Sequence, residues 1–565
     1  MFASIKTLLG EIIGQEVILE LPKNKDFGHI ATPIAFSLAK LQKRSPLQIA
    51  QEICQTLESN PKSREAFAKI SQINGYINLT LSAKFFNQCI NKVFQKAKDC
   101  NTKGQQIDSI KSTNTSKTSQ KILLEYVSAN PTGPLHIGHA RGAVYGDSLS
   151  RVGRYLGLDI LTEYYINDAG AQMDKLAHSL AISALEILGI QTLPTILAQA
   201  QQAGEIYKGD YIIKVANDAL SHFGKEFFAK ETIMQNIVSL REFAKDTMLN
   251  LIKDDLKKLD ISFDNFVSEK SLYSQWNETL AELKAHNGIY NEGDKIWLKS
   301  SQFSDEKDRV VVRENGEPTY LAGDIIYHRY KYTRGFNKLI NIWGADHHGY
   351  IPRVKAAMEF LGFDSSRLEV LLAQMVSLLK DGKPYKMSKR AGTFILISDV
   401  LSETSPDALR FVFLSKKPDT HLEFDIDAFS KEDSSNPIFY INYANARIHT
   451  MCAKSSLTHE EILRGEIAEI NEGESANEGA TKDIMELAFL ALLLPRVVEM
   501  AYEERSLQKI CEYLKNLASA YHGFYNAKKI LDSKNEAIYL KISKLVSLSI
   551  TQGLYLLGIQ AKTKM

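Results

Sequence analysis

The spacing of apolar residues at the start of the chain changes from a helical pattern to a strand-like one. Residues Phe2–Ile13 and Ile34–Leu41 have helical periodicity, whereas Tyr76–Leu81 reads as a strand. We therefore expect residues 1–100 to form a small α+β module. Residues 101–120 contain eight Ser or Thr and no aromatic residue, so this segment is predicted to be a flexible linker.

After the linker, short apolar runs alternate with helical patterns. Lys121–Val127 and Ile160–Ile166 read as strands on either side of a helix over residues 140–156. Lys338–Trp343 reads as a later strand, followed by a helix over Pro352–Leu361. Strands that alternate with helices predict a parallel sheet, whose ligands bind beyond the carboxyl ends of the strands.

The stretch between these two strand–helix units reads as an insertion at about residues 170–310. It contains helical patterns at Gln172–Leu188 and Phe223–Leu259. Near its end we expect a hairpin whose strands, Arg309–Arg313 and Thr319–Leu321, flank an Asn-Gly turn.

From Pro406 to the C-terminus the patterns are almost entirely helical, interrupted by a polar, Glu-rich segment at residues 465–479 that is typical of a solvated loop. The expected fold is α/β. Residues 121–405 should form a Rossmann-like parallel-sheet nucleotide-binding domain split by the insertion. Residues 406–565 should form an all-α helical bundle.

Composition narrows the class of protein without choosing a function. The 565 residues are 44% hydrophobic and 24% charged, which is typical of a globular chain of several domains. The 68 Lys and Arg nearly cancel the 67 Asp and Glu, so any nucleic-acid site must be a local basic face. Five cysteines without a C-x-x-C pair, and no signal peptide or membrane-length apolar run, predict a soluble cytoplasmic protein with no membrane partner.

Two histidines lie where the first strand of the sheet meets its helix. In His136-Ile-Gly-His139 the imidazoles are three residues apart, and Gly138 lets a nucleotide approach the backbone. The N-terminus of the helix supplies free N–H groups for phosphate. Two unrelated surface histidines are the alternative, and the strand–loop–helix setting favours a phosphate site.

A glycine-bracketed loop at residues 381–393 contains Lys383, Lys386, Lys389 and Arg390. Such a run is usually a solvated basic loop. Together with the histidine motif, it instead suits a mobile loop that closes over polyphosphate. The P-loop and dinucleotide-binding glycine motifs are absent from the sequence, which disfavours kinases, GTPases and dehydrogenases.

These motifs resemble those of a known family. His136–His139 resembles the HIGH signature, and Lys386-Met-Ser-Lys-Arg390 resembles the KMSKS signature, of class I aminoacyl-tRNA synthetases, with Arg390 in place of the final Ser. Four segments narrow the resemblance to arginyl-tRNA synthetases, and an N-terminal module before the catalytic domain is characteristic of that family. The segments are EYVSANPTGPLHIGHAR (125–141), YYINDAGAQM (164–173), GADHHG (344–349) and NPIFYINYANARI (436–448).

The resemblance implies an enzyme that activates L-arginine with ATP and transfers it to the 3′-terminal adenosine of tRNA(Arg). It assigns stabilisation of the transition state to His136, His139, Lys386 and Lys389. The ATP-binding residues that it implies are Ala129, Asn130, Pro131, Thr132, Gly133, Pro134, Leu135, His136, Ile137, Gly138, His139, Gly344, Asp346, His347, Lys386, Met387, Ser388 and Lys389.

The implied arginine site needs a carboxylate, because a guanidinium is permanently charged and offers five N–H donors. Tyr320 and Asp324 are four residues apart and would project from one helical face, although an ordinary polar helix face is the alternative. By resemblance they line the pocket for the arginine side chain. The full set of expected arginine contacts is Ser128, Asn130, His139, Glu163, Asn167, Tyr320 and Asp324.

The helical C-terminal region resembles an anticodon-binding domain of the DALR type, beginning near Asp407-Ala-Leu-Arg410. Tyr440, Tyr443 and Arg447 could combine stacking and phosphate contacts on one surface, although aromatic residues at this spacing are more often core. The resemblance adds Met565 as an anticodon contact, and a contact of the N-terminal module with the tRNA elbow.

No zinc is expected. Asp346, His347 and His348 are adjacent along the chain, but no further, suitably spaced ligand accompanies them. Mg²⁺ should arrive with ATP, and a monomer is the default state. Another class I synthetase, a non-catalytic tRNA-binding paralogue and a nucleotidyltransferase with similar histidine chemistry remain alternative functions.

Overall fold

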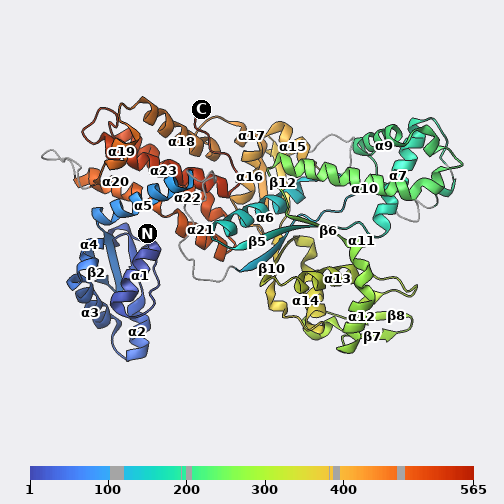
Figure 1. Cartoon of the computed structure of the whole chain (residues 1–565), viewed down its shortest axis with the longest axis horizontal. Helices are drawn as coiled ribbons and strands as arrows, with labels where there is room; N and C mark the ends of the chain where they lie inside the picture. Colours follow the sequence, from blue (N-terminus) through green and yellow to red (C-terminus); the bar gives the residue numbers. More distant parts are fainter. Residues whose placement is uncertain are drawn as a thin grey trace. The chain divides into compact units, whose positions relative to one another are not determined.

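The computed structural model of the chain describes residues 1–101, 120–192, 194–196, 198, 206–380, 382–385, 395–467 and 478–565 (Figure 1). The chain divides into two compact units. Lys117–Lys431 form one unit, and Met1–Ser116 together with Glu432–Met565 form the other.

A five-stranded parallel sheet lies at the centre of the unit Lys117–Lys431. The next strand along the chain after β4 (Lys121–Glu125) is its neighbour β5 (Asp159–Ile166), whereas its other neighbour, β10 (Lys338–Gly344), comes much later. The strand order therefore reverses between β4 and β10, which is where open α/β sheets bind ligands. The three strands expected here and their parallel arrangement are confirmed. Across the sheet the strands are β11 (Leu368–Ala373), β10 (Lys338–Gly344), β4 (Lys121–Glu125), β5 (Asp159–Ile166) and β6 (Asn265–Ser268).

Helices cover both faces of this sheet (Figure 1). Helix α6 (Ile137–Tyr155) packs on one face, where Gly142 lies against Ile342 of β10. Helices α13 (Tyr320–Thr333) and α14 (Ile351–Phe360) pack on the other, in a core that includes Leu339 of β10. Leu339 and Ile342 are three residues apart, so they face opposite sides of the pleated strand.

The expected insertion consists of two parts separated by a strand of the main sheet. The first part is helical and has its own apolar core, formed by α7 (Ala171–Ile187), α9 (Asp210–Phe223) and α10 (Ile233–Lys258). Strand β6 then joins the main sheet, and short helices α11 (Glu269–Leu272) and α12 (Trp276–Ala285) follow. The predicted helix over Phe223–Leu259 starts later than expected, because Gly224 has a φ of 79° and ends α9.

The second part is a small antiparallel sheet of β7 (Ile289–Glu292), β8 (Lys295–Leu298) and β9 (Arg309–Val312). The prediction of a further strand at Thr319–Leu321 is wrong. The Asn-Gly turn does form, with Gly316 at a φ of 80°, but α13 begins at Tyr320. As part of α13, Leu321 is buried in the core between this helix and the main sheet.

The expected domain boundary at residues 405/406 falls inside this unit, which continues to Lys431. Arg410 of α16 (Pro406–Leu414) is buried, hydrogen-bonds Asp147 of α6 and donates to the carbonyl of Leu259 at 2.7 Å. The remaining elements are α15 (Ile397–Glu403), α17 (Ile426–Ser430) and the sheet β13 (Lys383–Pro384), β12 (Val376–Lys380) and β14 (Leu422–Asp425).

The other unit combines the two ends of the chain. The expected helices near residues 2–13 and 34–41 and the strand Tyr76–Leu81 are confirmed. Its N-terminal elements are α1 (Phe2–Ile13), β1 (Ile30–Thr32), α2 (Ile34–Gln42), α3 (Pro46–Ser59), α4 (Pro61–Ala66), β2 (Phe67–Ile73), β3 (Tyr76–Leu81) and α5 (Ala83–Asn101). Its C-terminal helices are α18 (Pro437–Lys454), α19 (His459–Arg464), α20 (Glu478–Leu492), α21 (Leu494–Glu503), α22 (Gln508–Ala527) and α23 (Glu536–Leu556).

Contacts join the two ends within this unit. The side-chain oxygen of Asn87 accepts the backbone N–H of Ile467 at 3.2 Å, and the rings of His29 and Phe489 lie 4.9 Å apart. Residues 102–119 of the predicted linker and residues 468–477 of the predicted polar loop lie outside the described residues. Among the helices that the structure describes, none has the length and apolar character needed to cross a bilayer.

Gly146 lets α6 approach the sheet, and replacing it by alanine should destabilise the unit. A Cβ at this position would lie 2.3 Å from the ring of Tyr126, which is completely buried. We expect Gly146→Ala to lower the free energy of unfolding by about 1–3 kcal/mol, even though alanine favours helix. Urea denaturation measures the difference.

The matched control is Gly142→Ala on the same helix, where the nearest atom to a new Cβ is 3.8 Å away. That substitution should be neutral or stabilise by up to about 1 kcal/mol, through helix propensity alone. Equal effects of the two substitutions would contradict the close packing of Tyr126 on Gly146.

Candidate active site

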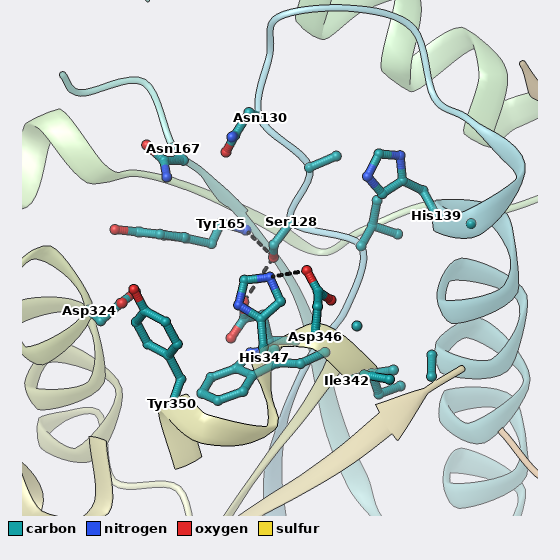
Figure 2. Close-up of a pocket in the computed structure, with 18 of the residues that line it drawn as sticks. Ser128, Asn130, His139, Tyr165, Asn167, Asp324, Ile342, Asp346, His347 and Tyr350 are labelled. Carbon is teal, nitrogen blue, oxygen red and sulfur yellow. Dashed lines mark hydrogen bonds and ion pairs between the residues drawn. The ribbon is translucent and has the colours of Figure 1, made fainter. Parts of the chain in front are cut away.

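A pocket of about 680 Å³ opens at the carboxyl ends of β4 and β10 (Figure 2). Its lining combines the segment between β4 and α6, the ends of β5 and β11, helix α13 and the segment after β10. The sequence-predicted residues that line it are Ser128, Ala129, Asn130, His136, Gly138, His139, Asn167, Tyr320, Asp324, Gly344, Asp346 and His347. In Figure 2, Asp324 and His139 lie on opposite sides, with Ser128 between them.

His136 and His139 stack on each other at the start of α6, with ring centroids 3.6 Å apart. The backbone N–H of His136 donates to Nδ1 of His139 at 3.4 Å, so the proton of a neutral His139 lies on Nε2. Burial lowers the pKa of both imidazoles, and that of His139 falls to about 3 with His136 contributing. The pair is therefore neutral near pH 7 and can donate hydrogen bonds, but brings no positive charge.

The chain returns to this motif after the predicted phosphate loop. Lys386, Met387, Ser388 and Lys389 lie outside the described residues. The residues that follow the loop pair with the histidine motif, since the N–H of Ile137 donates to the carbonyl of Ile395 at 2.9 Å. The N–H of Ile397 likewise donates to the carbonyl of Leu135 at 3.0 Å.

The segment that follows β4 is sharply bent. Val127 and Ser128 have positive φ values of 69° and 43°. Such a value is a genuine outlier for the β-branched side chain of Val127. Two contacts of Ser128 Oγ hold the bend: it donates to Glu125 Oε1 at 2.9 Å and accepts the N–H of Tyr165 at 3.2 Å. Backbone strain of this kind is concentrated at functional sites.

Carboxylates form one wall of the pocket. Asp324 of α13 and Glu269, the first residue of α11, both line it. Gly323 permits their close approach, because a Cβ there would lie 2.3 Å from Glu269 Oε1. Burial raises the pKa of Asp324 to about 8, with repulsion from Glu269 and Glu125 adding to the effect. Burial, followed by a smaller repulsion from Asp168, raises the pKa of Glu269 to about 7.

Sequence reasoning missed Glu269 and Glu125 as pocket residues. Both lie at or just beyond the carboxyl end of a strand of the main sheet, the position where this class of fold binds ligands. Glu125 ends a strand that the sequence does predict. Glu269 follows the four-residue strand β6, which is too short to give a clear pattern.

Glu163, expected to contact arginine, does not line the pocket. It is completely buried, with Oε2 2.6 Å from Arg334 Nη1, and its Oε1 accepts the hydroxyl of Tyr327 at 2.9 Å. Tyr327 does line the pocket, and its ring stacks on that of Tyr165 at 4.0 Å. Glu163 therefore supports a pocket wall from behind, because its own oxygens are already occupied by internal partners.

The predicted nucleotide loop reaches the pocket only in part. Ala129 and Asn130 line it, and Asn130 donates to the side chain of Gln172 at 2.7 Å. The residues between Asn130 and His136 do not line the pocket, and neither does the buried Ile137. The expected nucleotide contacts are therefore not all brought to one surface. The residues that do not line it are Pro131, Thr132, Gly133, Pro134, Leu135 and Ile137.

The segment after β10 forms a 3₁₀ helix, Ala345–Tyr350. Gly344 permits this bend, because a Cβ there would lie 2.4 Å from Asp346 Oδ1. The side chain of Asp346 pairs with His347 at 3.6 Å (Figure 2). Gln374 and Met375 close this side of the pocket, and the buried guanidinium of Arg141 holds the Gln374 carbonyl at 3.0 Å.

The other predicted binding residues lie in the second unit. The guanidinium of Arg447 lies 4.5 Å from the ring of Tyr443 and 4.3 Å from that of Tyr525, and Tyr443 is 40% exposed. Tyr440 packs on His522 at 4.5 Å. These residues form a partly exposed surface on α18 and α22 that combines aromatic rings with a cation.

Two buried asparagines attach the end of the chain to the same helix. Asn442 accepts the N–H of Lys562 at 2.8 Å, and Asn445 donates to the carbonyl of Lys562 at 3.0 Å. Met565, three residues further on, is 53% exposed.

Comparison with family models assigns almost the whole chain. Residues 105–431 match the model described as "tRNA synthetases class I (R), catalytic domain", and residues 441–565 match the "DALR anticodon binding domain". Residues 3–81 match the "Arginyl tRNA synthetase N terminal domain".

Individual proteins agree with this assignment. The chain is 53% identical to the arginine–tRNA ligase of Wolinella succinogenes over 565 residues, 100% of both chains, and 51% identical to that of Campylobacter jejuni over 98% of both. A solved structure titled as a putative arginyl-tRNA synthetase from Campylobacter jejuni is 52% identical, with a TM-score of 0.76 over 86% of this chain and 100% of that chain. The Thermus thermophilus arginyl-tRNA synthetase, at 19% identity and a TM-score of 0.72 over 100% of both chains, shares the fold.

Proposed function

This chain belongs to the arginyl-tRNA synthetase family, and we propose that the pocket at the carboxyl ends of β4 and β10 is its site of arginine activation. The function is that of an arginine–tRNA ligase, which uses ATP to join arginine to tRNA. The observation that supports the proposed site is an acidic wall, formed by buried Glu269 and by Asp324, that lies across one pocket from the histidine motif.

The acidic wall suits the side chain of arginine. Asp324 and Glu269 offer carboxylate oxygens to a planar group with five donors, and Tyr320 lies one helical turn before Asp324. Among the described residues, the lining includes no Lys or Arg that could neutralise these carboxylates. A neutral analogue would leave the carboxylates without a partner, so we propose that the wall selects for the guanidinium charge.

Ser128, Asn130 and Asn167 lie on the side of the pocket between this wall and the histidines. We assign them to the amino and carboxylate groups of arginine. Glu163 is proposed to act indirectly, through Tyr327.

ATP is proposed to lie over the start of α6, with its adenosine toward Gly344, Asp346 and His347. The arginine carboxylate attacks the α-phosphorus in line, a new phosphorus–oxygen bond forms, and pyrophosphate leaves with the electrons of the broken bond. Neutral His136 and His139 donate hydrogen bonds to phosphate oxygens as charge develops there. Such catalysis depends on positioning and charge stabilisation, not on covalent intermediates.

Lys386 and Lys389 are proposed to supply the positive charge that the histidines lack. The support is that Ile395 pairs with the histidine motif, and six residues of chain can span roughly 20 Å from Ile395 back to Lys389. Among the described residues no three metal-ligand side chains form a cluster. We therefore propose that Mg²⁺ enters as the ATP complex and keeps phosphate and water oxygens as ligands.

The second step transfers arginine to tRNA. We propose that Tyr440, Tyr443 and Arg447 contact the anticodon with Met565, through stacking and phosphate contacts. The N-terminal module is proposed to contact the tRNA elbow. A monomer in the cytoplasm remains the proposed state, and the free thiols of Cys54, Cys89, Cys452 and Cys511 fit a reducing compartment.

The function is tested by charging total tRNA with each of the twenty amino acids. We expect only arginine to be attached, and arginine alone to support pyrophosphate exchange with ATP when tRNA is present. Exchange with another amino acid would refute the specificity and favour a different class I enzyme. Binding of tRNA without exchange would favour a non-catalytic paralogue.

The two ends of the pocket should respond to different substitutions. Asp324→Asn keeps the shape of the side chain but removes its charge, so we expect kcat/KM for arginine to fall by about 100-fold or more, with KM for ATP changed less than about threefold. Asp346→Asn is the matched control at the adenosine end, and should raise KM for ATP more than KM for arginine. Steady-state exchange kinetics distinguish them, and equal effects on both substrates would remove Asp324 from the arginine site.

Arginine binding should release protons near pH 7. In the free protein Asp324 and Glu269, with pKa values of about 8 and about 7, retain protons that a guanidinium would displace. The affinity for arginine should therefore rise with pH between about 6 and 8 and level off above. Calorimetry in two buffers of different ionisation enthalpy measures the release, and identical heats would contradict the protonated wall.

A further inference from the structure

A row of polar side chains crosses the main sheet beneath the pocket. Asn341 of β10 is paired in register with Glu125 of β4, and Glu125 with Glu163 of β5. All three are at most 4% exposed, and paired residues on adjacent strands are about 4.8 Å apart. Two glutamates at this spacing repel each other unless each has a cationic partner.

Helix α13 supplies the cationic partner of Glu125 and a set of further polar groups. Asp324, Tyr327, His328 and Lys331 are at positions i, i+3, i+4 and i+7, so they form one stripe along the helix. This stripe packs against the sheet. Lys331 is completely buried and its ammonium pairs with Glu125.

Hydrogen bonds connect the polar stripe of α13 to the polar row of the sheet, and their donors and acceptors can be assigned in only one way. Lys331 Nζ donates to Asn341 Oδ1 at 2.9 Å, and Asn341 Nδ2 lies 2.9 Å from His328 Nε2. His328 Nδ1 lies 2.7 Å from the backbone carbonyl of Asp324. A carbonyl can only accept, so Nδ1 bears the proton and Nε2 accepts from Asn341. Lys331, Glu125, Asn341 and His328, here called the floor network, thus have complementary donors and acceptors.

Both ends of the floor network reach groups that face the pocket. At one end Glu125 accepts the hydroxyl of Ser128 and so holds the strained bend after β4. At the other end His328 holds the turn of α13 that presents Asp324. These two ends flank the proposed arginine site, on which the inference rests.

We propose that Lys331 is a positioning residue for arginine binding. Its ammonium fixes Ser128 through Glu125, and fixes the turn that presents Asp324 through Asn341 and His328. The positive charge also offsets repulsion among the carboxylates of the wall. Lys331 contacts neither substrate and acts entirely through these neighbours.

Stability alone does not account for this arrangement. Replacing a buried ion pair by neutral groups of similar size is often neutral or stabilising, whereas removing one partner is strongly destabilising. A neutral pair of similar size could therefore stabilise the sheet as well as Lys331 and Glu125 do. The specific contribution of the ion pair is to fix the orientation of two pocket residues, Ser128 and Asp324.

The experiment compares Lys331→Met with Arg154→Met in the full chain. Arg154 pairs with Asp264 at 2.6 Å, and its guanidinium donates to the carbonyl of Ile160 near the start of β5, away from the carboxyl ends of the strands. Both substitutions should lower thermal stability. In tRNA-supported exchange, we expect Lys331→Met to raise KM for arginine by about tenfold or more, with KM for ATP changed less than about threefold. Arg154→Met should leave both constants unchanged.

The pH dependence provides a readout that a loss of stability would not change. The charged groups that act on Asp324 are Glu269, Glu125 and Lys331, and the hydroxyls of Tyr165 and Tyr273 also interact with it. Because Lys331 lowers the pKa of Asp324, Lys331→Met should move the pH at which arginine binding levels off to a higher value.

A double variant separates positioning from charge balance. Glu125→Gln with Lys331→Met removes both charges, so thermal stability should recover relative to the single variant. KM for arginine should remain raised, because the donor to Asn341 is still missing. Recovery of the wild-type KM, or equal kinetics and pH profiles for Lys331→Met and Arg154→Met, would overturn the inference. Failure of the wild-type protein to activate arginine would instead refute the proposed function, and the inference with it.

Discussion

The gathering of three carboxyl groups at one wall of the pocket is the constraint on which the site depends. Glu125, Glu269 and Asp324 line one cavity, and Lys331 pairs with the first of them. A buried carboxylate without a partner either retains a proton or requires a cation, because desolvation strongly disfavours the bare charge. The raised pKa values of Asp324 and Glu269 show the first state in the free protein. A guanidinium, which does not lose its proton, produces the second.

The opposite side of the pocket has the reverse arrangement. Burial keeps His136 and His139 neutral, so the described part of that side presents hydrogen-bond donors without a fixed positive charge. This separation leaves Asp324 and Glu269 with no Lys or Arg beside them in the described lining of the pocket. The charge that ATP needs must therefore come from outside the described lining, and the two lysines of the KMSKS-like segment are the proposed source.

Much of the architecture follows from patterns within the chain. Strands β4, β5 and β10 and helices α1, α2, α7 and α14 form where apolar periodicity indicates them, because burial of one face determines both the element and its orientation. The histidine motif is likewise recognisable, since its strand–loop–helix context is a local property, whereas Asp324 was assigned to the pocket only through the resemblance to the family. By contrast, β6 is four residues long, and the strand expected at Thr319–Leu321 is replaced by the start of a helix. Packing on the main sheet decided both cases.

The sequence by itself determined the family, the parallel sheet and twelve of the 26 residues that line the pocket, because these depend on motifs and periodicity of short range. Only the tertiary structure showed that Glu269 joins Asp324 in one wall, that Glu163 lies behind Tyr327, and that Lys331 connects two sides of the pocket floor. Each of those relations joins residues far apart in the chain through strand register and helix packing. Register of this kind is set by the burial of whole faces, which no local pattern specifies.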